Sequence, residues 1–208
     1  MVPMLPNWDH ITQMLQLCDG LGVDRMSCLR FVPQTRGRNS RMKLSLHPHE
    51  FMQMQKDFVA LLAENYKCQL RLGCPIDFRH TVDNSMTAKA KPCHAGKDLI
   101  LVRPQGDVHP CAAWKTLPDT DNVRNSSLTE IWHNSAIFNE LRTYHEGKYL
   151  ERLDTEGHGC MCRNCRYRES CLSGCLAQRL HWLSYVENRD VGIDGIYETF
   201  ADPLCPIR

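Results

Sequence analysis

Apolar residues in the first third of the chain are spaced as in two helices with one strand between them. From Ile11 to Cys18 they recur every three or four positions, which predicts a helix over about 7–18 with Asn7 as its cap. The short apolar run from Met26 to Val32 is typical of a strand buried on both faces. A second helical stripe predicts a longer helix over about 47–66. This order predicts a helix–strand–helix layer that is too small to close a sheet by itself.

The pattern changes after about residue 67, where cysteine, proline and glycine rise and the apolar runs become short. An apolar run from Leu99 to Val102, then a turn over 104–107 that contains Gly106, then Val108 predict a β-hairpin over 97–109. Ser127 and Glu130 form a capping-box pattern that opens a predicted helix through about Arg142. A cysteine-rich stretch and a short helix are expected over 163–182. We therefore predict an α+β protein with a first part over 1–66, a linker over 67–92 and a second domain over 93–208.

Composition narrows the function classes. The chain has 208 residues, and 25 basic against 24 acidic side chains give a net charge of +1. This balance favours neither a nucleic-acid partner nor a membrane surface. No apolar run approaches the ~20 residues that span a bilayer, and the amino terminus lacks a signal-peptide pattern. Twelve cysteines without such a signal indicate a reducing, cytoplasmic setting in which thiols remain available to bind metal.

Seven of the twelve cysteines follow one register. Cys93 and Cys111 bracket the predicted hairpin, whose antiparallel strands bring its two ends close together. The C-x2-C pair of Cys162 and Cys165 lets two sulfurs point at one metal, and Cys171 is far enough along the chain to supply a third. Thiolates bind iron–sulfur clusters and zinc, usually four to a site. The register therefore offers ligands for two metal sites, with zinc and a disulfide framework as the alternatives.

The full register resembles the SPASM domain, the carboxy-terminal extension of radical S-adenosylmethionine maturases. The pattern is C-x12-G-x4-C, a gap, C-x2-C-x5-C-x3-C, another gap and a final cysteine, and it covers about 93–205. The segments flanking the cysteines agree with the family as well. They are His94-Ala-Gly96, Gly106-Asp-Val-His-Pro-Cys111, Leu128-Thr-Glu-Ile-Trp132 and Cys171-Leu-Ser-Gly-Cys175.

The resemblance implies two auxiliary [4Fe–4S] clusters. Three ligands of the first cluster would be Cys93, Cys111 and Cys175, and its fourth is an upstream cysteine in the family. Cys74 is the first candidate for that position, Cys68 the second, and an open iron the third. Cys160 lies outside the register, and Cys18 and Cys28 are expected in the core. The second cluster would be held by Cys162, Cys165, Cys171 and Cys205.

The first third resembles the last helix–strand–helix units of a radical S-adenosylmethionine partial (β/α) barrel. That family binds its catalytic cluster through C-x3-C-x2-C, and this sequence has no such triplet. The chain therefore resembles the carboxy-terminal half of an oxidoreductase or maturase, which alone should not cleave S-adenosylmethionine. The expected partners are a peptide, protein or cofactor-precursor substrate, an electron donor such as a flavodoxin or ferredoxin, and a chain that carries the missing half.

Other polar residues give weaker indications. His94 and His109 adjoin predicted ligands and are expected at the surface or behind the ligands. Tyr144, His145 and Glu146 form a polar group without a motif. No residue is identified as catalytic, and the alternative function is a zinc-binding structural or interaction module without redox activity.

Overall fold

The computed structural model describes residues 1–73, 93–118, 120–146, 148–156, 161–171, 174–197 and 201–205. The chain divides into two units. The first comprises Met1–Lys91 with Leu204–Arg208, and the second comprises Pro92–Pro203. The predicted linker over 67–92 falls largely in the segment 74–92, which lies outside the described residues.

The first unit is built on a pair of parallel strands. β1 pairs with β2 in the register from Arg25↔Gln69 to Leu29↔Gly73. The sequence predicted β1 but not β2, so the strand has a partner that local pattern did not reveal. The two predicted helices are present, although the second ends at Leu62 rather than near residue 66. The elements are η1 (Trp8–His10), α1 (Ile11–Gly20), β1 (Arg25–Leu29), α2 (Arg36–Asn39), α3 (Arg41–Leu44), α4 (Pro48–Leu62) and β2 (Gln69–Gly73).

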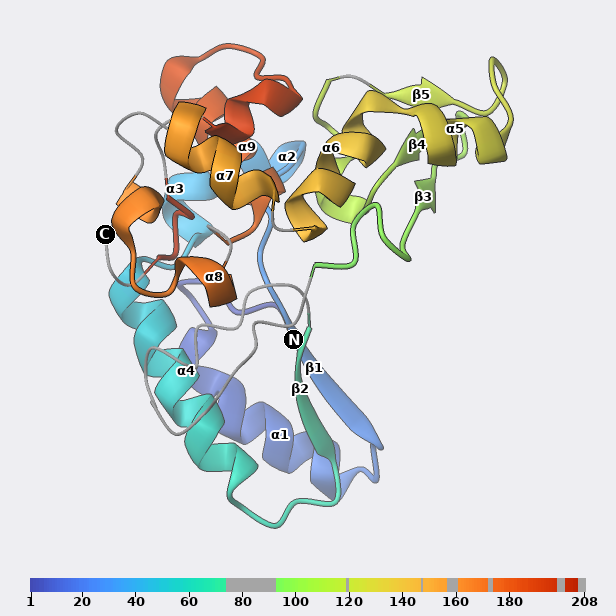
Figure 1. Ribbon diagram of the computed structural model, residues 1–208. Helices are drawn as coiled ribbons and strands as arrows, with labels where there is room; N and C mark the ends of the chain where they lie inside the picture. Colours follow the sequence, from blue (N-terminus) through green and yellow to red (C-terminus); the bar gives the residue numbers. More distant parts are fainter. Residues whose placement is uncertain are drawn as a thin grey trace. The chain divides into compact units, whose positions relative to one another are not determined.

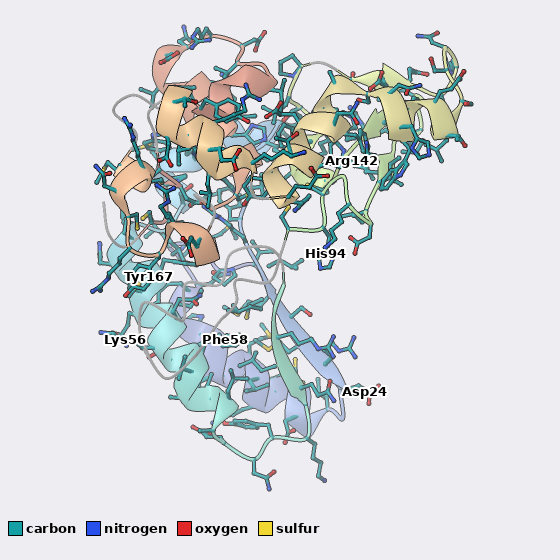
Figure 2. The ribbon with its side chains drawn as sticks, in the orientation of Figure 1. Asp24, Lys56, Phe58, His94, Arg142 and Tyr167 are labelled. Carbon is teal, nitrogen blue, oxygen red and sulfur yellow. The ribbon has the colours of Figure 1, made fainter. Side chains whose placement is uncertain are left out.

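An apolar core joins the helices to the strands in this unit. Figure 1 shows α1 and α4 running alongside the β1–β2 pair, and Figure 2 shows Phe58 pointing from α4 toward the strands. Phe58 is 1% exposed. Full burial of such a side chain contributes about 1.5–3 kcal/mol. The buried cluster consists of Ile11, Leu15, Met26, Cys28, Phe58, Leu61 and Cys68.

The ends of the two long helices are fixed differently. The predicted Asn7 cap is wrong, because the Asn7 side-chain oxygen accepts a hydrogen bond from the Met4 N–H (2.7 Å) and makes no cap bond. A ten-residue α1 therefore begins at Ile11, after a 3₁₀ turn. At α4, the His47 N–H donates to the Glu50 carboxylate (2.7 Å), and Pro48 occupies the first turn, where its missing N–H costs nothing.

The second unit begins with a small antiparallel sheet. β3 (Leu101–Val102) pairs with β4 (Asp107–His109), which confirms the predicted hairpin, and β4 also pairs with β5 (Asp121–Asn122). Gly106 has φ +91°, and a Cβ there would lie 2.6 Å from the Asn122 Oδ1. A glycine is therefore required at this turn both by backbone conformation and by space.

The capping box at Ser127 is present, but the helix it opens is shorter than predicted. Ser127 Oγ accepts from the Glu130 N–H (3.2 Å), and the Glu130 carboxylate accepts from the Ser127 N–H (2.8 Å). The single helix predicted through Arg142 is wrong, because Ser135 has ψ 130° and separates α5 (Leu128–Asn134) from α6 (Ala136–His145). A residue with extended ψ cannot continue the helical hydrogen-bond ladder.

The rest of the second unit consists of short helices. α7 is charged along most of its length but buries Tyr149 and Leu153, which are both 0% exposed. α9 is buried along most of its length. None of the helices in the described ranges is long and apolar enough to cross a membrane. These elements are η3 (Ala112–Trp114), α7 (Lys148–Glu156), η4 (Met161–Asn164), α8 (Arg168–Cys171), α9 (Leu176–Glu187) and η5 (Ile193–Tyr197).

Candidate metal centre

The predicted cysteine ligands lie where short elements begin or end in the second unit. Cys111 is the residue before η3, and Cys175 is the residue before α9. Cys171 is the last residue of α8. Cys205 falls in the first unit, and Cys74 and Cys160 lie outside the described residues. The remaining predicted ligands in the second unit are Cys93, Cys162 and Cys165.

Tyr144 is a buried phenol that holds the backbone next to a predicted ligand. It is 4% exposed and donates a hydrogen bond to the Gly174 carbonyl (3.1 Å). Burial is the largest cause that raises the pKa of Tyr144 well above its ordinary value, followed by negative charge on Cys93, Tyr149, Cys171 and Cys175. The hydrogen bond ties α6 to the residue directly before Cys175, 30 positions further along the chain.

Two histidine side chains hold the stretches that follow Cys93 and Cys111, which are predicted ligands of the first cluster. Each histidine donates a hydrogen bond to a backbone carbonyl. His145, next to Tyr144 in α6, donates to the Ala95 carbonyl (2.8 Å), two residues after Cys93. His181 of α9 donates to the Ala113 carbonyl (2.8 Å), two residues after Cys111. Because Cys175 opens the same α9, all three cysteines are tied to the helices α6 and α9.

A buried carboxylate fixes the backbone at Cys175. Asp202 is 1% exposed, and its Oδ2 accepts from the Cys175 N–H (2.9 Å). Gly174 has φ +80°, and a Cβ there would lie 2.6 Å from the Asp202 Cβ. The carboxylate thus occupies the space that a side chain at position 174 would need. Glycine is therefore required at position 174, directly before Cys175.

Backbone hydrogen bonds within the stretch from Cys162 to Cys171 fold the part of the chain that carries three predicted ligands of the second cluster. The Cys165 N–H donates to the Cys162 carbonyl (3.2 Å), and the Cys171 N–H donates to the Tyr167 carbonyl (2.8 Å). Arg168 links this loop to α7 through a bidentate pair with Asp154, at 2.8 and 2.7 Å. This bidentate pairing lowers the pKa of the Asp154 carboxyl.

His109, the last residue of β4, is a buried side chain whose ring has no hydrogen bond to the described residues. It is 1% exposed, and neither ring nitrogen has a hydrogen-bond partner among the described residues. Burial, and after it the charge of Arg103, lowers the pKa of His109 and favours the neutral imidazole. A buried imidazole without a partner is costly, so a group that binds nitrogen at this place would stabilise the fold.

The donor set fits an iron–sulfur cluster better than the alternatives. None of the ten cysteines in the described ranges forms a disulfide, which leaves soft sulfur donors for iron. In the same ranges, no three His, Cys, Asp or Glu side chains form a group that could hold a single metal ion.

Cys68, the second candidate for the fourth ligand, lies in the apolar core of the first unit. It is 2% exposed and belongs to the cluster around Phe58. Burial raises the pKa of the Cys68 thiol, and nearby charge on Cys18 and Asp19 raises it further. A raised pKa disfavours the thiolate that iron requires. Cys28 lies in the same core, as expected, and its pKa is raised to about 11.

Comparison with known families matches part of the second unit. Residues 93–166 match the family model of SPASM, described as an iron–sulfur cluster-binding domain. This part of the chain is therefore similar to a SPASM domain.

Curated relatives agree with this class. The PqqA peptide cyclase of Gluconobacter oxydans is 31% identical over 106 residues, which are 49% of this chain and 26% of that protein. The AdoMet-dependent heme synthase of Methanosarcina barkeri is 26% identical over 186 residues, 83% of this chain and 48% of that protein. The chain thus spans about half or less of the length of these relatives.

A solved structure shares the fold. Streptococcus suis SuiB bound to S-adenosylmethionine matches 85% of this chain and 40% of its own, with a TM-score of 0.54 and 14% identity. A second structure of SuiB matches 98% of this chain and 44% of its own, with a TM-score of 0.55 and 13% identity. The match shows the mixed helix-and-sheet fold.

Sequence reasoning did not find the residues that hold the ligand stretches in place. Tyr144 and His145 stood out only as a polar group without a motif, and Asp202 and Arg168 gave no signal. Their roles depend on contacts between segments 14 to 50 residues apart. The positioning role of a buried carboxylate or phenol can be assigned only once its hydrogen-bond partner is known.

Proposed function

We propose that this chain is the auxiliary-cluster portion of a radical S-adenosylmethionine maturase that modifies a peptide, protein or cofactor precursor. The first part, 1–66, would supply the last helix–strand–helix units of a partial (β/α) barrel. The part from 93 to 208 would be the SPASM domain, with 67–92 as the linker. The observation that carries the proposal is the match of residues 93–166, which include Cys93, Cys111, Cys162 and Cys165, to an iron–sulfur cluster-binding domain.

Two [4Fe–4S] clusters are proposed, each with its own ligand set. Cys93, Cys111 and Cys175 would hold the first, with Cys74 as the fourth ligand taken from the sequence. The second would be held by Cys162, Cys165, Cys171 and Cys205. When bound, such clusters supply one-electron transfer, with potentials that depend on burial and on hydrogen bonds to sulfur.

The described residues would keep the ligands in place and exclude water. Tyr144 and Asp202 hold the Gly174–Cys175 backbone from two sides through the hydrogen bonds at 3.1 and 2.9 Å. The Arg168–Asp154 pair holds the second stretch against α7. A rigid protein frame reduces the rearrangement that electron transfer requires. We assign these residues positioning roles and no catalytic one.

The proposed partners follow from the relatives and from the missing catalytic motif. A cyclase of the PqqA peptide is among the relatives, which supports a peptide substrate. Without C-x3-C-x2-C, the chain needs a source of the catalytic cluster and of S-adenosylmethionine cleavage. A flavodoxin or ferredoxin would supply electrons.

Substitution of one ligand tests the proposal. Anaerobically prepared Cys165→Ala should lose one cluster's worth of iron, about four atoms per chain, and the matching part of the broad visible absorbance. The control is Cys160→Ala, which removes a cysteine outside the register and should leave iron and absorbance unchanged. Unchanged iron in Cys165→Ala, or a colourless zinc-containing wild type, would contradict the proposal.

A further inference from the structure

The stretch 161–171, which carries three proposed ligands of the second cluster, also carries a local excess of positive charge. It contains three arginines against one acid, whereas the whole chain has a net charge of only +1. The arginines alternate with the cysteines, and the proposed function uses only the pair that Arg168 forms with Asp154. The charged side chains of the stretch are Arg163, Arg166, Arg168 and Glu169.

Asp154 of α7 holds this stretch in place but neutralises only part of its charge. The carboxylate forms the bidentate pair with Arg168, at 2.8 and 2.7 Å, and lies 4.0 Å from the Arg163 Nε. Arg168 also donates to the Arg163 carbonyl (2.7 Å), which fixes the backbone directly after Cys162. Two guanidinium groups therefore share one carboxylate on a held loop. A surface that is already ordered loses little conformational entropy when a partner binds.

The side chains beside these arginines have the composition of a protein–protein interface. Arg166 is exposed, and its guanidinium carbon lies 4.7 Å from the centre of the Tyr167 ring (Figure 2). Met161 is 56% exposed. Arginine, tyrosine and methionine are enriched at interfaces relative to the rest of a protein surface. We call the set of Met161, Arg163, Arg166 and Tyr167 the arginine face.

Chain connectivity places the arginine face next to the proposed second cluster. Arg163 directly follows Cys162, and Arg166 directly follows Cys165. Consecutive Cα atoms are only about 3.8 Å apart. A protein docked on these arginines therefore contacts the backbone segment that would hold the iron. Positive charge attracts an acidic partner, and a position beside the cluster suits a partner that exchanges electrons with it.

We propose that the arginine face is the docking surface for a small acidic electron-transfer protein that reduces the second cluster. In the docked complex one electron passes from the donor's reduced cofactor to the [4Fe–4S] cluster, and no bond or proton is transferred. Opposite charges speed association and are screened by salt, so binding should be tight at low ionic strength and weak at high ionic strength. This inference rests on the proposed function and adds the surface that receives the electron donor.

Binding of an acidic plant-type ferredoxin to the anaerobically reconstituted 208-residue chain tests this surface. The Kd measured by calorimetry should rise at least about 10-fold between about 0.01 and about 0.1 M salt, because the Debye length falls from about 30 to about 10 Å. A chain that holds iron and sulfide but binds ferredoxin without salt dependence would overturn the inference and leave the proposed function intact. A chain without iron and sulfide would overturn both.

Charge reversal at one arginine locates the surface. Arg166→Glu should weaken ferredoxin binding at low salt by at least about 10-fold and leave cluster reduction by dithionite unchanged. Arg166→Lys keeps the charge and should retain most of the affinity. Arg124→Glu, at an exposed arginine before α5, is the matched control, because it makes the same change in net charge and should alter binding little. Equal losses of affinity in the two glutamate variants would overturn the inference.

Glu169→Lys tests the same surface in the opposite direction and leaves every arginine in place. Glu169 is exposed, so its replacement adds positive charge to the stretch without removing a buried contact. The variant should bind ferredoxin several-fold more tightly at low salt than the wild type. If Arg166→Glu loses iron, Glu169→Lys decides the question, and unchanged or weaker binding in this variant would overturn the inference.

Discussion

The two units differ in what surrounds their cysteines. The first packs two helices and two parallel strands around a continuous apolar core, as in an ordinary α/β layer. The second has short strands and helices, and its cysteine-bearing stretches are joined by single hydrogen bonds from Tyr144, His145, Asp202 and His181. Large apolar side chains are fully buried in both units, Phe58 in the first and Phe138 and Tyr149 in the second, but most of the proposed ligands lie in the second. We therefore expect metal binding and folding to be coupled mainly in the second unit.

Removal of iron should give the largest effect, and it should fall mainly on the second unit, which holds most of the proposed ligands. After anaerobic treatment with a chelator and an oxidant, amide protection in α6 and α9 should fall by at least about 10⁴-fold, or about 5.6 kcal/mol. Protection in α1 and α4 should remain. Hydrogen exchange read by mass spectrometry measures both regions in one sample. An equal loss of amide protection in the two units would contradict the expected difference between them.

The converse experiment weakens the apolar core. Phe58→Ala should lower the free energy of unfolding of the first unit by about 3–5 kcal/mol, since it removes a fully buried aromatic side chain. Iron content should not change. Lys56→Ala, at an exposed position of the same helix, should have little effect on either quantity. Denaturant titration and iron analysis measure the two quantities, and a loss of iron in Phe58→Ala would contradict the separation.

How far the sequence predicted these units depends on the range of the contacts involved. The α1 and α4 stripes, the hairpin and the Ser127 cap are local patterns, and all are present. β2 was missed because its parallel pairing with β1 joins residues 44 positions apart, as in Arg25↔Gln69. The break at Ser135 was missed because Ile131, Phe138 and Leu141 fit a continuous helical face.

The candidate site was predictable to a similar extent. The cysteine register pointed to the family, because spacing is a property of the sequence itself, and the ligand sets it suggests remain predictions. The residues that orient the ligands were not predictable, since Asp202 and Tyr144 act through a backbone N–H and a carbonyl that any residue could provide. His109 was singled out from the sequence because it lies near Cys111. That its ring has no hydrogen-bond partner among the described residues is apparent only from the fold.

A small change at Gly174 should disturb the second unit selectively. Gly174→Ala should cost about 1–3 kcal/mol, because φ is +80° and the new Cβ would meet Asp202 at 2.6 Å. The shift of the Cys175 backbone should also loosen the first cluster and lower the iron content. Gly20→Ala is the control, since nothing lies within 4 Å of a Cβ there and the helix α1 should gain about 0.5–1 kcal/mol. Similar effects at the two glycines would show that the close contact with Asp202 is unimportant.

The smallest predicted effect concerns the cap of α5 and depends on pH. Hydrogen bonds from the Ser127 backbone and side chain lower the pKa of Glu130 below its ordinary value of 4.5. The resulting stabilisation is present above about pH 4.5 and is lost as the pH falls through the lower folded-state pKa. Ser127→Ala should cost about 1 kcal/mol at neutral pH and weaken this dependence. Thermal unfolding between pH 3 and 7 would measure both, and an unchanged profile would show that the cap contributes nothing.

The most direct test is to quantify iron and acid-labile sulfide in the anaerobically prepared chain, with zinc measured in the same sample. Two four-iron clusters predict about eight iron and about eight sulfide per chain, with little zinc. Zinc in place of iron, or iron without sulfide, would contradict the account of the second unit.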